Sequence, residues 1–116
     1  MQQMFPNINF DVATFVYQIL KKKKMDDISQ LITLPGTVIV DVRTPAEFSA
    51  GHAAKSVNIP LPDLSNYLDE FKEMKHIIFC CASGVRSLKA SLLLKQYGIG
   101  CFNGGTWVNI DKFLNN

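Results

Sequence analysis

The residues best suited to chemistry lie in one short segment, Cys81-Ala82-Ser83-Gly84-Val85-Arg86-Ser87, which joins an apolar run to a leucine-rich helical pattern. A tight loop of small residues that leads straight into a helix presents backbone N–H groups on its inner side, where the helix dipole adds partial positive charge. Arg86 adds a full positive charge. Such surroundings lower the pKa of a thiol, and the thiolate is the attacking form. We therefore expect Cys81 to be an activated nucleophile held among main-chain donors.

The other two of the three cysteines, Cys80 and Cys101, lie in apolar stretches where a small buried side chain is expected. An odd number of cysteines, two of them adjacent, is unlike the layout of a secreted disulfide framework. A disulfide between neighbouring residues would also be strained. The pattern predicts core packing at Cys80 and Cys101 and chemistry at Cys81.

A cysteine phosphatase is the main alternative chemistry, because its loop also joins a cysteine to an arginine before a helix. Counted from Cys80, five residues precede Arg86 and a serine follows it, which satisfies the bare phosphatase pattern. Counted from Cys81, only four residues precede Arg86. A tetrahedral phosphate needs a wider ring of N–H donors than a single sulfur atom does. The six-residue loop from Cys81 to Arg86 therefore favours sulfur chemistry.

Three charged residues are candidate supports for this loop. Asp41 ends a predicted strand, and its carboxylate could orient Arg43 or Arg86, or cap the following turn. Arg86 could attract anions, or it could hold the loop through a carboxylate such as that of Glu47. No metal site or other cofactor is expected, because the two histidines lie 24 positions apart and no cluster has the spacing of metal ligands.

Length and composition indicate one ordinary globular domain. The chain has 116 residues, 47% of them hydrophobic, and no apolar run approaches the roughly 18 residues of a membrane span. Its net charge of +2 depends on the run Lys21 to Lys24, without which eight basic residues face ten acidic ones. We expect neither nucleic acid nor membrane as a partner. No secretory signal is visible at the N-terminus, so a cytoplasmic location is expected.

The elements that must position the loop follow from periodicity and from turn signals. Strands alternate with helices, and the apolar runs of the strands suit a sheet buried on both faces. This order predicts an α/β fold with a small parallel sheet flanked by helices on both faces, preceded by an N-terminal helical extension over residues 1–24. The domain itself is expected over 25–116. The predicted helices cover 9–23, 26–33, 45–50, about 63–71, 88–97 and 106–114, and the predicted strands cover 37–42, 56–59, 77–80 and about 101–102, with a turn at 103–105.

Several short motifs, taken in order, resemble those of a single-domain rhodanese, a rhodanese-like sulfurtransferase. The resemblance runs from about Val38 to Trp107. It rests on Asp41-Val42-Arg43, Glu47-Phe48, Gly51-His52, Asn58-Ile59-Pro60-Leu61, the loop Cys81 to Ser87, and Gly104-Gly105 with Trp107. The segment after His52 reads Ala-Ala-Lys-Ser, where the family usually has Ile-Pro-Gly-Ala.

The resemblance implies a rhodanese fold and a sulfurtransferase. Cys81 would take a sulfane sulfur from a thiosulfate-like donor, hold it as a persulfide, and pass it to cyanide or to a thiol, including a protein thiol. The loop residues Ala82 to Ser87 would bind the sulfur, with Asp41 and Arg43 in support. A general base is not needed once the thiol is ionised, so His52 is expected to make a structural hydrogen bond. A persulfide carrier and a non-catalytic binding module stay open as alternatives.

Overall fold

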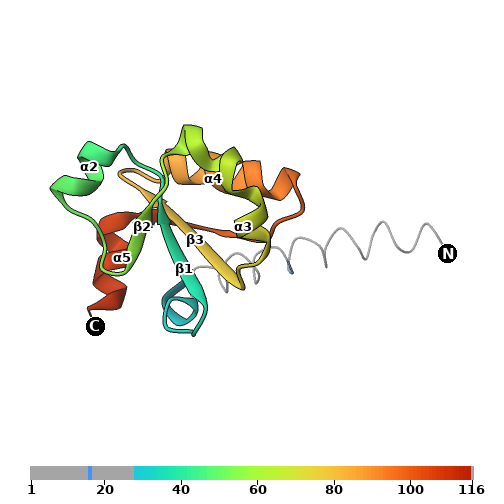
Figure 1. Ribbon diagram of the computed structural model, residues 1–116. Helices are drawn as coiled ribbons and strands as arrows, with labels where there is room; N and C mark the ends of the chain where they lie inside the picture. Colours follow the sequence, from blue (N-terminus) through green and yellow to red (C-terminus); the bar gives the residue numbers. More distant parts are fainter. Residues whose placement is uncertain (1–15, 17–27, 116) are drawn as a thin grey trace.

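A four-stranded parallel sheet forms the centre of the computed structural model, which describes residue 16 and residues 28–115 (Figure 1). The strand order is β2-β1-β3-β4, so the chain crosses over between non-consecutive neighbours. All three strand pairs are parallel. The strands are β1 (Thr37–Asp41), β2 (Ser56–Asn58), β3 (His76–Cys81) and β4 (Phe102–Thr106).

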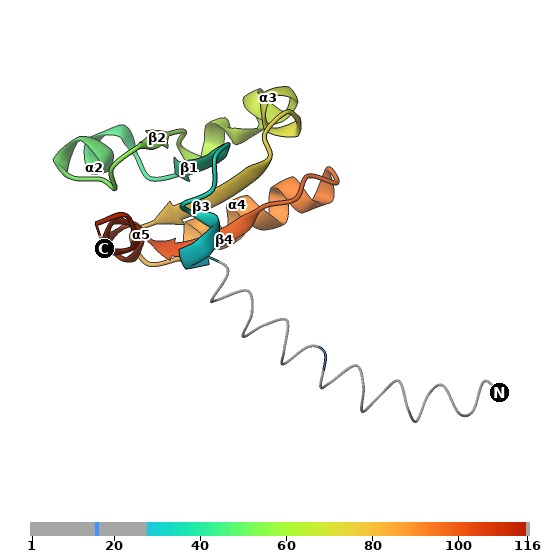
Figure 2. The ribbon, with the colours of Figure 1, turned by 90° about the horizontal axis from the view of Figure 1, so that it is seen from below.

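Helices cover both faces of this sheet, which confirms the predicted α/β architecture. The helix α4 lies with η1 and α3 on one side of the sheet, and α5 lies on the other side with a helical turn at residues 28–31 (Figures 1 and 2). The helical segments are α2 (Pro45–Ala50), the 3-10 helix η1 (Leu61–Tyr67), α3 (Leu68–Lys72), α4 (Val85–Gln96) and α5 (Trp107–Leu114).

Alternation along β3 divides the core into two clusters, because successive side chains of a strand point to opposite faces. Ile77, Phe79 and Cys81 pack in the cluster beneath α4, whereas Ile78 and Cys80 pack in the cluster with α5. The residues Ile77 to Cys81 are all buried, as expected for a central parallel strand. The two adjacent cysteines therefore face opposite sides of the sheet.

The short helix α2 begins as the sequence predicts. The Thr44 hydroxyl accepts a hydrogen bond from the Glu47 N–H, and the Glu47 carboxylate accepts one from the Thr44 N–H, which completes a capping box. Pro45 occupies the first helical position, where its missing N–H removes no hydrogen bond. The cap fixes the position of the Glu47 side chain.

The predicted turn at 103–105 is wrong, because these residues belong to β4. Phe79 pairs with Asn103 and Cys81 pairs with Thr106. Between these two pairs, β4 therefore has one residue more than β3. Gly105 has φ 81°, a conformation that glycine adopts without strain. The two glycines therefore form a bulge in the strand instead of ending it.

We expect Gly104→Ala to destabilise the fold by about 1–3 kcal/mol through overpacking. A Cβ at this position would lie 2.7 Å from Cγ2 of Ile78, 2.8 Å from Cδ1 of Ile110 and 3.0 Å from the Phe79 carbonyl oxygen. Urea denaturation measures the free energy of unfolding, and Gly100→Ala is the matched control because nothing lies within 4 Å of its added Cβ. Equal stability of the two variants would contradict the packing described for β4.

Other expectations meet the structure with small differences. The predicted helix near 63–71 is a 3-10 helix followed by the short α3, and the predicted strand 77–80 extends over His76–Cys81. The predicted helix 9–23 lies outside the described residues apart from Val16, and the domain boundary near residue 24 stays a prediction. Among the described residues, no helix is long and apolar enough to cross a membrane.

Candidate active site

The loop predicted to carry the chemistry lies between the carboxyl end of β3 and the start of α4. Cys81 is the last residue of β3, and α4 begins at Val85 after three small residues. Gly84 precedes α4 with φ 96°, a left-handed conformation that side chains disfavour. The tight turn aims the N-terminal end of a twelve-residue helix at Cys81.

The sulfur of Cys81 is the focus of the loop's hydrogen bonds. Cys81 Sγ accepts from the Gly84 N–H at 3.0 Å and from the Ser87 N–H at 3.4 Å. The Ser87 hydroxyl oxygen lies 3.4 Å from the same sulfur. Cys81 and Ser87 are both fully buried. The loop thus holds the sulfur with donors that would stabilise negative charge on it.

Two opposing effects set the pKa of Cys81. Burial raises the pKa, because it disfavours the thiolate. The hydrogen bonds from the Ser87 side chain, the Ser87 N–H, the Gly84 N–H and the Ser83 N–H act against burial, and the net result is a pKa below the ordinary value of 9.0. Cys81 is therefore more readily ionised than an ordinary thiol, as its sequence context predicts.

Cys80 has the opposite character. Its side chain is buried with Ile39, Ile78 and Ile110 on the other face of the sheet, and burial raises its pKa to about 12. Cys101 is also buried, and Cys80, Cys81 and Cys101 form no disulfide with one another. Because Cys80 faces away from the loop, the phosphatase pattern counted from Cys80 has no matching geometry in the fold.

Iodoacetamide is expected to alkylate Cys81 much faster than Cys80 near neutral pH. Iodoacetamide reacts with the thiolate form. The alkylation rate of Cys81 should therefore stay high until the pH falls below the lowered pKa of Cys81. Cys80 stays protonated at these pH values because its pKa is raised. Ser87→Ala removes one donor to the thiolate, and the rate should fall about two- to tenfold at neutral pH. Peptide mass spectrometry over a pH series measures both rates. Equal alkylation rates at the two cysteines would contradict the opposite pKa shifts of Cys81 and Cys80.

Arg86 holds the loop through a carboxylate, which was one of its two predicted roles. Its guanidinium donates to both carboxylate oxygens of Glu47, at 2.8 and 3.0 Å, across 39 positions of sequence. The hydrogen bond with Arg86 is the main cause that lowers the pKa of Glu47 to about 2. Since Glu47 also caps α2, this pair connects α2 to the start of α4.

Asp41 supports Arg43, and the two form a buried ion pair. The Arg43 side chain donates to both carboxylate oxygens at 2.8 to 3.0 Å, and the Arg43 N–H donates to Asp41 Oδ1 at 3.0 Å. Asp41 thus orients Arg43 and also caps the turn. The Arg43 guanidinium also bonds the carbonyl oxygens of Glu47 and Gly51, and it lies 4.9 Å from the Trp107 ring centroid. Neither Asp41 nor Arg43 hydrogen-bonds the Cys81 sulfur, whose partners are Gly84 and Ser87, so their support of the loop is indirect.

One residue that supports the loop was not anticipated as such. The Asn103 side chain donates to the Gly84 carbonyl oxygen at 3.4 Å and accepts from the Gly105 N–H at 3.0 Å. Its position beside two glycines suggested only a turn. His52 behaves as expected for a structural residue, because its Nδ1 lies 2.7 Å from the Phe48 carbonyl oxygen and its ring stacks on Phe48 at 3.7 Å.

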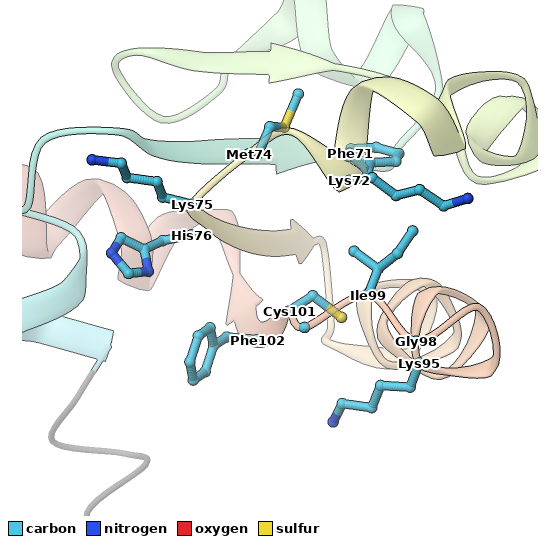
Figure 3. Close-up of a pocket in the computed structure, with 11 residues that line it drawn as sticks. Phe71, Lys72, Met74, Lys75, His76, Lys95, Gly98, Ile99, Cys101 and Phe102 are labelled. Atoms are coloured by element: carbon cyan, nitrogen blue, oxygen red, sulfur yellow. The ribbon is translucent and has the colours of Figure 1, made fainter.

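A cavity of about 490 Å³ lies at the opposite edge of the sheet, where β3 and β4 begin (Figure 3). Several lysines line it, but Lys72 and Lys75 point to opposite sides in Figure 3 and do not converge on one point. Cys81 does not line this cavity. In the part of the chain that the structure describes, no group of His, Cys, Asp and Glu side chains could hold a metal ion.

Comparison with known proteins identifies the family of this chain. The sequence profile of the Rhodanese-like domain matches residues 22–107. The chain belongs to the rhodanese-like domain family. Among solved structures, a rhodanese-like domain protein from Staphylococcus aureus aligns with a TM-score of 0.61 at 29% identity, covering 71% of this chain and 80% of that one.

Two curated relatives align with most of this chain. The uncharacterized protein YqhL of Bacillus subtilis is 31% identical over 91 residues, which cover 78% of this chain and 72% of that protein. The tRNA uridine(34) hydroxylase of Yersinia pestis is 33% identical over 97 residues, which cover 78% of this chain and 26% of that enzyme. The chain therefore spans about a quarter of the length of the hydroxylase.

Proposed function

We propose that the protein is a sulfurtransferase that moves a sulfane sulfur from a thiosulfate-like donor to a thiol or to cyanide through a persulfide on Cys81. The observation that carries the proposal is the convergence of loop donors on Cys81 Sγ at the N-terminal end of α4. Backbone donors favour an anionic sulfur there, both in the thiolate and in the persulfide. The six-residue loop from Cys81 to Arg86 supports sulfur chemistry, because a tetrahedral phosphate would need a wider ring of N–H donors.

The first half of the cycle loads the enzyme. The Cys81 thiolate attacks the outer sulfur of thiosulfate and forms a new S–S bond. The S–S bond of thiosulfate breaks, and sulfite leaves with the electron pair. The product is a Cys81 persulfide anion, whose charge the Gly84 and Ser87 N–H groups are placed to stabilise.

The second half unloads the enzyme. Cyanide or a thiolate attacks the outer sulfur of the persulfide, the Cys81 S–S bond breaks, and the electron pair returns to Cys81 as a thiolate. Thiocyanate or a persulfide of the acceptor leaves. No separate base is required, because each leaving group is an anion and the attacking groups are already ionised.

The donor must approach through the exposed part of the loop. Ala82 and Ser83 are exposed above the buried sulfur, and both side chains are small. A modest shift of these two residues would open Sγ to a small anion, whereas Asn103, Glu47 and Arg86 hold the rest of the loop. This arrangement suits a donor as small as thiosulfate.

Glu47→Gln is expected to lower the KM for thiosulfate about two- to fivefold at low ionic strength. The wild-type carboxylate neutralises Arg86 and repels a dianion, whereas glutamine can keep the cap of α2 without the charge. The difference between the two proteins should shrink above about 0.5 M salt, since the Debye length falls below ~5 Å. Steady-state kinetics with the exposed-site control Asp69→Asn measure this effect. An unchanged KM, or the same change in the control, would contradict it.

Steady-state formation of thiocyanate from thiosulfate and cyanide tests the proposed function. A persulfide intermediate predicts double-displacement kinetics, in which double-reciprocal plots at several cyanide concentrations are parallel. Intersecting lines would indicate direct transfer between the two substrates and would overturn the persulfide mechanism. Folded protein without any turnover would favour a binding module that keeps the fold.

A further inference from the structure

Helix α4 exposes aliphatic side chains on its outward face. Its buried face combines Ser87, Ala90 and Ser91 with Leu94, and the half-buried Leu93 also packs against the core. The outward face instead carries the aliphatic residues Val85, Leu88 and Leu92, which are 58%, 48% and 53% exposed. The hydrophobic effect favours removal of such side chains from water, and this domain leaves these three in contact with solvent. The exposed aliphatic stripe is therefore a feature that the stability of this domain does not require.

The three aliphatic residues share one face and begin at the active-site loop. Their spacing of three and then four positions places them on one side of an α-helix. Val85 stands four residues after Cys81 and opens α4, so the stripe runs from the reactive sulfur along the helix. A protein that covers this stripe would have part of its surface beside the loop.

Positive charge borders the stripe on both sides. Lys89 follows Leu88 directly, and Lys95 lies three positions after Leu92, so helical geometry places one lysine on each flank. Both lysines are exposed, and α4 contains no acidic residue. A complementary surface would present aliphatic or aromatic side chains between carboxylates.

We propose that the outward face of α4, made of Val85, Leu88 and Leu92 between Lys89 and Lys95, docks a thiol-bearing acidic protein that exchanges sulfur with Cys81. This inference rests on the proposed sulfurtransferase function. The acceptor thiol loses its proton to water, and the resulting thiolate attacks the outer sulfur of the Cys81 persulfide. An S–S bond forms on the acceptor, the Cys81 S–S bond breaks, and its electron pair returns to Cys81.

Other occupants fit this face less well. A second copy of the chain would set basic α4 against basic α4, which like-charge repulsion disfavours. The helical turn at residues 28–31 lies on the opposite face of the sheet, because Ile28 and Leu31 pack in the cluster with α5. A nucleic acid would pair with the lysines but gains little from aliphatic side chains, since its bases stack on aromatic rings.

The probe is a synthetic helical peptide with leucines at helical spacing, glutamates on both flanks and one terminal cysteine. Its isomer with the same composition in scrambled order is the reference acceptor. We expect the persulfide of the wild-type protein to transfer sulfur at least ~10-fold faster to the amphipathic peptide than to the isomer, which corresponds to about 1.4 kcal/mol. The Leu88→Ser/Leu92→Ser double variant should remove that preference.

Controls separate docking from chemistry. The double variant should keep wild-type turnover of thiosulfate with cyanide, and Tyr97→Ser, which alters another exposed side chain at the end of α4, should keep the peptide preference. Equal rates for the peptide and its isomer, or an unchanged preference in the double variant, would overturn the docking proposal.

Binding to the Cys81→Ser protein tests the surface without sulfur transfer. Fluorescence anisotropy should show tighter binding of the amphipathic peptide than of the isomer, and the Leu88→Ser/Leu92→Ser changes should abolish the difference. If this binding holds while wild-type protein forms no persulfide, the proposed function fails and the docking surface stands. Tighter binding of an oligonucleotide, or a dimer that the double variant abolishes, would assign the face to a different occupant and overturn the proposal.

Discussion

Replacing Cys81 with serine should lower the turnover of thiosulfate with cyanide by about 10³-fold or more, because the hydroxyl is a far weaker nucleophile than a stabilised thiolate. Serine is nearly isosteric and can still accept the hydrogen bonds of Gly84 and Ser87. The fold should therefore survive while the chemistry is lost. Spectrophotometric measurement of thiocyanate, with thermal unfolding as the check on folding, gives both results.

Cys80→Ala is the matched control for this experiment. Cys80 packs among Ile39, Ile78 and Ile110, where alanine leaves only a small cavity and a serine hydroxyl would lack a partner. Turnover should stay within about twofold of the wild type, since Cys80 faces away from the loop. If Cys80→Ala lost activity and Cys81→Ser kept it, the nucleophile would be Cys80 and the phosphatase count would have to be reconsidered.

Asp41→Asn should lower the free energy of unfolding by about 3–5 kcal/mol, more than the other conservative changes proposed for this domain. The substitution leaves the Arg43 guanidinium buried without its counter-ion, since the Arg43 side chain is 5% exposed and that of Asp41 is 0% exposed. Such a loss is large beside the 5–15 kcal/mol that stabilise an ordinary domain. Urea denaturation of the variant measures it.

Arg43→Lys provides a graded comparison in case Asp41→Asn does not fold. Lysine keeps the positive charge but loses the paired donors and the contact with Trp107, so a smaller loss of about 1–3 kcal/mol is expected. Asp69→Asn, on the exposed side of α3, should change the free energy of unfolding by less than ~0.5 kcal/mol. A variant of Arg43 as stable as wild type would show that the buried pair is not a structural support.

Local sequence signals were sufficient for most of the fold. The capping box at Thr44 and Glu47 predicted the start of α2, and the apolar runs at 37–42 and 77–80 predicted the two central strands, because these features depend on neighbouring residues. The loop from Cys81 to Ser87 was also recognisable, since the strand, the small residues and the helix follow one another in the chain.

Long-range pairing accounts for what the sequence could not determine. Two neighbouring glycines suit a turn and a strand bulge equally, and only the pairing of β4 with β3 makes Gly104-Gly105 a bulge. The same pairing brings Asn103 to Gly84. Arg86 had two open roles until the fold placed it against Glu47, which lies 39 positions earlier in the chain.

The central claim is a persulfide on Cys81, and intact-mass measurement tests it most directly. Wild-type protein is treated with thiosulfate, freed of excess reagent and measured without reductant. We expect a mass increase of one sulfur atom, located on the peptide that contains Cys81, lost on addition of cyanide and absent from Cys81→Ser protein. Folded wild-type protein that gains no sulfur, or an equal gain in Cys81→Ser protein, would contradict the claim.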